Sequence, residues 1–294
     1  MAIPLVQELI FGLVLGSYIA LAAIGFTLIY GLVNMINFAH GEFVTIGAYV
    51  GLVAAQVAGM PIPGAILVAF AVTAVIGWGL AEVTFEPLNE AGAIPLLLTS
   101  IGLGLVLRNG IRIAAGASPR YFETTQPTVY RFADLGFFFT SRHVAVVGVT
   151  LLAVLILHLF LNRTKLGVAM RATADNENLA LVTGINTKRV RTAVWLIASG
   201  LAGVAGVLLA VNRAASPSVG FSQLLLVLTA AILGGAGSPY GAVVGSYILG
   251  IGISVAIATL PTSVSDFGTT MAFVVLIAVL LLRPGGIAGK EVRT

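Results

Sequence analysis

The chain has 294 residues, of which 59% are hydrophobic and only 9% are charged, with a mean hydropathy of +1.07. Because soluble domains carry about a quarter charged residues, this composition excludes an ordinary soluble protein and indicates a protein of the lipid bilayer. The net charge of +4 is interpreted as an excess of Lys and Arg in cytoplasmic loops rather than as a nucleic-acid surface. The absence of cysteine excludes disulfides, thiolate metal sites and a catalytic cysteine.

Apolar runs of about 20 residues, the length that crosses a bilayer as a helix, recur along the chain. The first has no basic leader and is too long for a cleaved signal peptide, so it is interpreted as a span. The predicted fold class is all-α: a polytopic transmembrane bundle of about eight to ten spans with broken helices, forming a single transmembrane domain over residues 1–294. Nine spans are predicted, near residues 7–30, 36–58, 63–85, 94–115, 143–162, 191–211, 223–236, 240–260 and 268–283.

Two of these runs are weak candidates for a full crossing. The run 36–58 contains His40 and Glu42, and the run 223–236 is short and ends in "GGAGSPYG". Each is predicted either to cross or to form a broken or re-entrant segment, which is tolerated at membrane depth where protein or a water-filled cavity shields the backbone.

The second run and the residues just before it hold an unusual group of polar side chains. Asn34, Asn37, His40, Gly41 and Glu42 are candidates for lining a translocation path, because polar residues at membrane depth are costly and usually functional or interior. On a helix, Asn34, Asn37 and Gly41 would share one face, and a break at Gly41 would free backbone groups to face the path. The alternative is that Asn34 and His40 lie at the cytoplasmic interface and only cap and anchor a helix.

Arg108 and Arg112 lie four residues apart near one end of the fourth span, so they share a helix face. They either extend to the outer headgroups or make a polar contact inside the bundle or with a docking protein. The following stretch, 116–142, has nearly balanced charges and is predicted as an outer loop. Within it, "PTVYRF" and "FFFT" are predicted to form a strand or an interfacial aromatic patch.

The polar segment 163–191 carries six of the fifteen basic residues and is predicted to be cytoplasmic, as is the C-terminus, whose tail adds three more. Thr173 or Asp175 is predicted to cap a short helix at about 174–183, with Asp175 and Glu177 in its first turn and Gly184 as the left-handed residue that ends it. So short a helix is marginal without a packing surface, which indicates a partner; an ordinary solvated connector is the alternative.

These segments resemble the permease subunits of branched-chain amino acid ABC importers (LivH type). The resemblance rests on "GSYIALAAIGFTLIYGLVNMINFAHGEFVTIGAY" and on "GVAMRATADNENLALVTGINTKRV" followed by "SGLAGVAGVLLA". It extends through "LLTSIGLGLVLRNGIR", "AAILGGAGSPYGAVVGS" and "LLLRPGGIAG", which follow in order over nearly the whole chain.

In that family the loop after the fifth span holds the coupling helix, which docks on a cytoplasmic ATPase. The resemblance therefore implies that Asp175, Asn176, Glu177, Ala180 and Gly184 make or border this contact. It also implies a second permease subunit of similar type, two cytoplasmic ATPases, a soluble periplasmic or extracellular substrate-binding protein and a location in the cell (inner) membrane.

The chain itself is expected to bind no ATP, metal or other cofactor, and to be no enzyme. Its nearest likeness to a phosphate loop, "GGIAGKE", has the wrong spacing and lacks Ser or Thr after the lysine. The three histidines lack metal-ligand spacing. The predicted function is translocation of branched-chain or other hydrophobic amino acids; the alternatives are a urea, amide or sugar permease of the same family, or an ion-coupled secondary transporter using His40 and Glu42.

Overall fold

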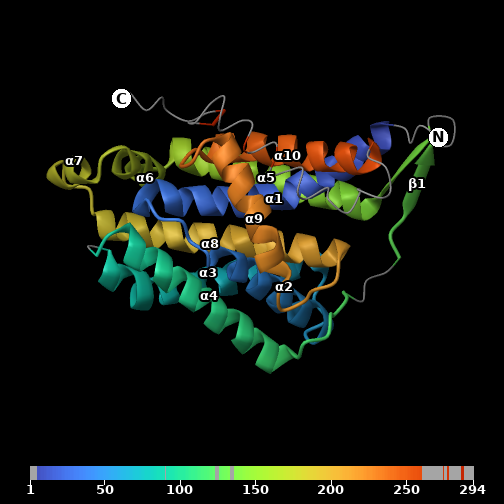
Figure 1. Ribbon diagram of the computed structural model, residues 1–294, viewed down its shortest axis with the longest axis horizontal. Helices are drawn as coiled ribbons and strands as arrows, with labels where there is room; N and C mark the ends of the chain where they lie inside the picture. Colours follow the sequence, from blue (N-terminus) through green and yellow to red (C-terminus); the bar gives the residue numbers. More distant parts are fainter. Residues whose placement is uncertain are drawn as a thin grey trace.

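The computed structural model describes residues 5–89, 91–122, 126–132 and 136–259, together with residues 274, 277, 286 and 287. Within these residues the chain is almost entirely helical, as the sequence predicts (Figure 1). The elements in order are α1 (Leu5–Val33), α2 (His40–Gln56), α3 (Ile62–Leu80), the π-helix η1 (Ala81–Phe85), the 3-10 helix η2 (Glu86–Leu88), α4 (Ala93–Ala115), β1 (Val129–Phe132), β2 (Phe137–Thr140), α5 (Ser141–Arg163), α6 (Lys165–Asp175), α7 (Glu177–Val182), α8 (Thr187–Asn212), α9 (Val219–Gly234) and α10 (Pro239–Thr259).

Six of the described helices are long and apolar enough to cross a membrane, which confirms the polytopic bundle. They are α1, α3 with its extension through η2, α4, α5, α8 and α10. The two weak runs form shorter helices, α2 with 17 residues and α9 with 16. The predicted ninth span, 268–283, lies outside the described residues except for positions 274 and 277.

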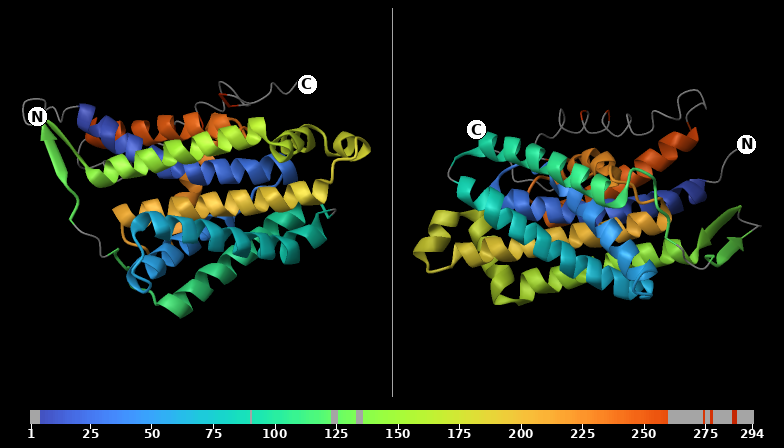
Figure 2. Two further views of the ribbon diagram at one scale, coloured as in Figure 1. Left: turned by 180° about the vertical axis from the view of Figure 1, so that it is seen from behind. Right: turned by 90° about the horizontal axis from the view of Figure 1, so that it is seen from below.

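The long helices lie side by side along one direction, while α9 runs steeply across them (Figure 1). The helices α6 and α7 form one end of the molecule, called here the loop end, and the β1–β2 hairpin lies at the other, called the hairpin end (Figures 1 and 2). The two predicted loops, 163–191 and 116–142, therefore lie at opposite ends of the bundle.

Small residues allow the central helices to approach closely. A Cβ added at Gly12 of α1 would lie 2.5 Å from the Cα atom of Ile251 in α10, and one at Gly206 of α8 would lie 2.0 Å from the carbonyl oxygen of Val44 in α2. In lipid, helices associate through such van der Waals packing rather than through a hydrophobic force, so these glycines are part of the structural framework.

The chain between α1 and α2 is not helical, and this corrects the prediction that Asn34, Asn37 and Gly41 share one helix face. Asn34 adopts a left-handed conformation (φ 52°) and its amide donates to the Tyr30 carbonyl at 2.8 Å, which ends α1. Asn, like Gly, tolerates this conformation well. The break thus occupies residues 34–39, before His40, rather than Gly41.

The predicted helix at about 174–183 is replaced by two helices, because Asn176 interrupts the segment. Asn176 is extended (φ −161°) and its Oδ1 accepts from the Leu179 amide at 2.9 Å, so it caps α7, whereas Asp175 ends α6. Thr173 is an interior residue of α6, so neither predicted cap is correct. Gly184, which follows the C-cap residue Thr183 of α7, has φ 85° and is left-handed, as predicted.

Of the two alternatives for 116–142, the structure shows the predicted strand, as one half of a hairpin, while an interfacial position of its aromatic side chains stays a prediction. β1 and β2 pair antiparallel, with Val129 opposite Thr140 and Phe132 opposite Phe137. The rings of Phe132 and Phe137 stack with their centroids 5.1 Å apart. Cross-strand aromatic pairs of this kind stabilise an isolated two-stranded sheet.

Candidate functional site

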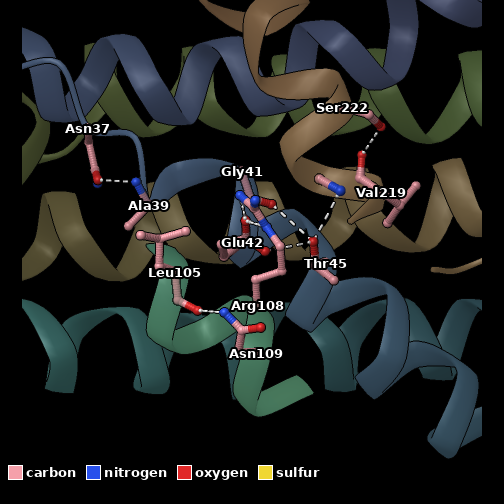
Figure 3. Close-up of polar contacts among 11 residues, drawn as sticks. Asn37, Ala39, Gly41, Glu42, Thr45, Leu105, Arg108, Asn109, Val219 and Ser222 are labelled. Carbon is pink, nitrogen blue, oxygen red and sulfur yellow. Dashed lines mark hydrogen bonds and ion pairs between the residues drawn. The ribbon is translucent and has the colours of Figure 1, made fainter. Parts of the chain in front are cut away.

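The centre of the bundle contains a buried ion pair between two predicted site elements. The Glu42 side chain, in the first turn of α2, is fully buried, and Arg108 of α4 donates from Nη2 and Nε to its Oε1 at 2.7 and 3.0 Å (Figure 3). The Arg108 guanidinium also lies 3.8 Å from the centroid of the Phe221 ring in α9. Arg108 therefore makes the polar contact inside the bundle, the second of its two predicted alternatives.

Thr45 extends this network to α9. Its hydroxyl accepts from the amide of Gly220 at 3.1 Å and lies 3.3 Å from Glu42 Oε2 (Figure 3). A Cβ added at Gly220 would lie only 1.8 Å from the carbonyl oxygen of Gly41, so the first turns of α2 and α9 touch backbone to backbone. The first turn of α2 and the Arg108 guanidinium thus both favour the negative charge of Glu42, and Thr45 links this carboxylate to the first turn of α9.

His40 and Asn37 hold the entry to α2 in place. The His40 side chain is fully buried with Nε2 2.9 Å from the carbonyl oxygen of Ala22, midway along α1, so α2 begins inside the bundle and not at its surface. The buried Asn37 accepts at Oδ1 from the Ala39 amide at 3.0 Å. Asn34, in contrast, is exposed where α1 ends. The alternative prediction placed both Asn34 and His40 at the cytoplasmic interface. The exposed Asn34 is compatible with it, and the fully buried His40 is not.

The second group of predicted residues lies apart from the first, at the loop end. Ala180 is 3% exposed and faces the bundle, while the outward side of α7 is apolar: Leu179, Leu181 and Val182 are 61%, 51% and 85% exposed. Sequence reasoning emphasised the polar positions and did not single out these three. The signal available was their apolar character in an otherwise polar loop.

One arginine ties α7 to the bundle. Arg191, in the first turns of α8, donates from Nη1 to Glu177 Oε1 at 2.5 Å and from Nε to Glu86 Oε1 at 2.9 Å. Glu177 belongs to α7 and Glu86 to η2 at the end of α3, so this side chain joins three elements. Its 15% exposure and two carboxylate partners make it a stronger tie than an isolated surface pair.

Next to Arg191, α8 and the end of α3 are joined twice more. Lys188 pairs with Glu82 at 2.9 Å, and the rings of Trp195 and Phe85 stack at 5.1 Å with an interplanar angle of 7°. Arg191 and Glu86 were missed as site residues by sequence reasoning. The sequence feature that could have indicated them is their spacing. The acids Glu82 and Glu86 and the bases Lys188 and Arg191 are each about one helical turn apart, so the two pairs can face each other across adjacent helices.

Comparison with known proteins identifies the family to which this chain belongs. The profile described as "Branched-chain amino acid transport system / permease component" matches residues 8–282. Curated relatives include the high-affinity branched-chain amino acid transport system permease proteins BraD of Pseudomonas aeruginosa, 34% identical over 97% of this chain and 95% of its own, and LivH of Escherichia coli K12, 35% identical over the same shares. The ribose import permease protein RbsC of Escherichia coli K12 is 28% identical over 79% of this chain and 72% of its own.

A full-length match and identities above 30% establish kinship at the level of the whole permease subunit. The six apolar helices agree with a multi-pass protein of the inner membrane. The chain belongs to the family of permease components of branched-chain amino acid transport systems.

Proposed function

We propose that this chain is a permease subunit of an ATP-driven importer of branched-chain, hydrophobic amino acids. A soluble binding protein delivers the substrate, a second permease subunit of similar type completes the path, and two cytoplasmic ATPases bind and hydrolyse ATP, so the chain itself needs no cofactor. The sugar alternative has weaker support, since the ribose permease is less similar and matches a smaller share of the chain.

The proposal rests on the exposed apolar face of α7, a helix that the ion pairs of Arg191 hold against the bundle. The end of the bundle that is rich in basic residues exposes the apolar side chains of Leu179, Leu181 and Val182 to solvent. An exposed apolar patch rimmed by polar groups is typical of a protein-binding site. We assign this face, bordered by Asn176 and Gly184, to the ATPase.

The excess of Lys and Arg in segment 163–191 supports a cytoplasmic loop end. The hairpin end then faces outward, toward the binding protein. With the C-terminus also cytoplasmic, ATP-driven movement enters the chain at α7 and passes through Arg191 to α8 and to the end of α3.

The predicted path residues take a place in this mechanism through the centre of the bundle. Glu42, His40 and Gly41 fix the start of α2 against α1, α4 and α9. Because α8 packs on α2 through Gly206, a movement of α8 would also displace the start of α2, where these residues lie. Their contact with substrate, like that of Asn34 and Asn37, stays a prediction.

The test is uptake into proteoliposomes containing this chain, its partner permease and the ATPases, supplied with the binding protein. Leucine uptake should require ATP inside the proteoliposomes, on the side of the ATPases, and the binding protein outside, and ribose should not be taken up. Uptake of ribose in place of leucine, or leucine uptake without the ATPases, would refute the proposal.

A single substitution tests the docking face. Val182→Asp should reduce co-purification of the ATPases and abolish ATP-dependent uptake, because a charge enters an apolar interface. Val57→Asp is the matched control, since Val57 is similarly exposed, at 80%, near the hairpin end. Equal ATPase retention in both variants would remove the assignment.

A further inference from the structure

A sizeable cavity lies toward the hairpin end, away from the residues discussed so far. Its volume is about 650 Å³, within the range of small-molecule sites. Side chains of α1, α5, α9 and α10 and the residues at the end of α8 line it. Glu8 in the first turn of α1 and His143 in the first turn of α5, directly after β2, place it near the hairpin.

The walls combine opposite charges with apolar surface. Glu8 and Arg213 both line the cavity, and within the described parts of the chain neither takes part in a salt bridge. Val14, Leu226 and Ile253 supply apolar surface beside them. An acid and a base that leave each other unpaired at one cavity are available to bind a ligand that carries both charges.

Two further polar atoms in the cavity wall lack partners. Gln223 Oε1 and His143 Nδ1 are shielded from solvent, and within the described residues neither has a hydrogen-bond partner. Buried polar atoms are nearly always satisfied, so these two require a hydrogen-bond partner that the described residues do not supply.

We propose that this cavity receives the substrate as an α-amino acid zwitterion with an apolar side chain. Arg213 binds the carboxylate, Glu8 accepts from the ammonium group, and Val14, Leu226 and Ile253 contact the side chain. The assignment rests on the proposed function and names its binding site. A neutral sugar would leave both charges without a counter-charge, so the cavity selects against it.

The cavity closes toward the centre of the bundle. Tyr18 and Gln223 line both the cavity and a void of only about 10 Å³ below it, which is also lined by Ala22. The carbonyl of Ala22 is the contact of His40 Nε2. The closed floor therefore connects the cavity to the buried start of α2, and a movement of α2 or α9 would open it.

Because the chain contains no cysteine, a single introduced thiol reports on one position. Ser222→Cys places a thiol in an exposed position on the cavity wall. Ala114→Cys places one in the apolar cavity between α2 and α4, at the same end of the molecule. Both are labelled, in the assembled complex in proteoliposomes, with a membrane-impermeant thiol reagent.

Leucine-loaded binding protein should slow labelling at Ser222→Cys at least threefold and leave labelling at Ala114→Cys unchanged. Modification at Ser222→Cys should block leucine uptake while basal ATP hydrolysis continues. Equal labelling with and without leucine, together with unimpaired uptake after modification, would overturn the cavity assignment. Uptake by the unmodified complex is the separate control: if that complex does not transport leucine, the proposed function fails instead.

Charge variants provide a second readout. Arg213→Gln and Glu8→Gln should each lower kcat/KM for leucine-loaded binding protein at least tenfold, and Arg213→Lys should restore part of it. Arg213 is exposed and unpaired within the described residues, so the thermal stability of the complex should not change. If Arg213→Gln and Glu8→Gln both take up leucine as well as the wild-type complex does, the roles assigned to these two side chains are wrong.

Discussion

Glu42 Oε1 lies 2.7 Å from Arg108 Nη2, and this contact joins α2 to α4 at the centre of the bundle. Glu42 is fully buried and Arg108 is 21% exposed, so the pair is shielded from solvent on the carboxylate side. Removing one partner of such a pair is far more costly than removing both, because a lone charge stays buried.

Arg108→Ala should therefore destabilise the protein by about 3 to 5 kcal/mol. Glu42→Gln should cost less, because the amide oxygen still accepts from Arg108 and the guanidinium is partly exposed. Thermal unfolding in detergent, followed by size-exclusion chromatography of the soluble fraction, measures both. The double variant Glu42→Gln with Arg108→Ala should be more stable than Arg108→Ala alone; a double variant that is less stable than either single one would contradict the pairing.

Gly220→Ala should prevent correct folding, because its Cβ would lie 1.8 Å from the carbonyl oxygen of Gly41. Neither backbone can move away without loosening the contact between α2 and α9. Gly148→Ala in α5 is the control, since a Cβ there has no neighbour within 4 Å and alanine favours a helix. The measurement is the yield of monodisperse protein. Equal yields would show that α2 and α9 separate at little cost.

Asn176→Ala should weaken α7 by about 0.5 to 2 kcal/mol through loss of its cap. Transport coupled to ATP hydrolysis should fall, while membrane insertion stays normal. Asn178→Ala is the matched control, because Asn178 is an exposed asparagine in the same helix and caps nothing. The measurement is leucine transported per ATP hydrolysed, and a similar loss in both variants would argue against the cap.

Arg191→Met should uncouple the complex, since it separates α7 from Glu86 while preserving much of the side chain's apolar packing. ATP hydrolysis should continue with far less transport per ATP. Lys188→Gln is the control, because its pair with Glu82 is exposed to solvent and so contributes little to stability. Normal coupling in Arg191→Met would show that movement enters the bundle by another contact.

The helical class and the sites of the long spans follow from hydropathy, because lipid permits only a fully hydrogen-bonded backbone. The break at 34–39 could not be placed at the right residue. It depends on the left-handed Asn34 and on hydrogen bonds to distant partners, such as that from the Phe38 amide to Ser100 Oγ at 3.1 Å. The two-helix form of the loop was missed for a related reason: Asn176, Asp175 and Thr173 are all good caps, and tertiary packing selected among them.

The same limit applies to the candidate site. Sequence alone marks Glu42 as a costly charge and Arg108 as a costly cation, but no spacing rule links positions 66 residues apart. Arg191 was counted only as part of a basic loop. Its function as a tie between α7 and η2 depends on where α3 ends relative to α8, which is a property of the folded chain.

The short helices α2 and α9 meet at their first turns, where Gly41 and Gly220 are in contact. From this junction α2 extends toward the hairpin end, and α9 extends toward the loop end until it packs on the start of α10 at Gly234 and Gly241. Because no side chain separates the two helices and the Gly220 amide donates to Thr45, the start of α9 can shift only if the start of α2 shifts with it.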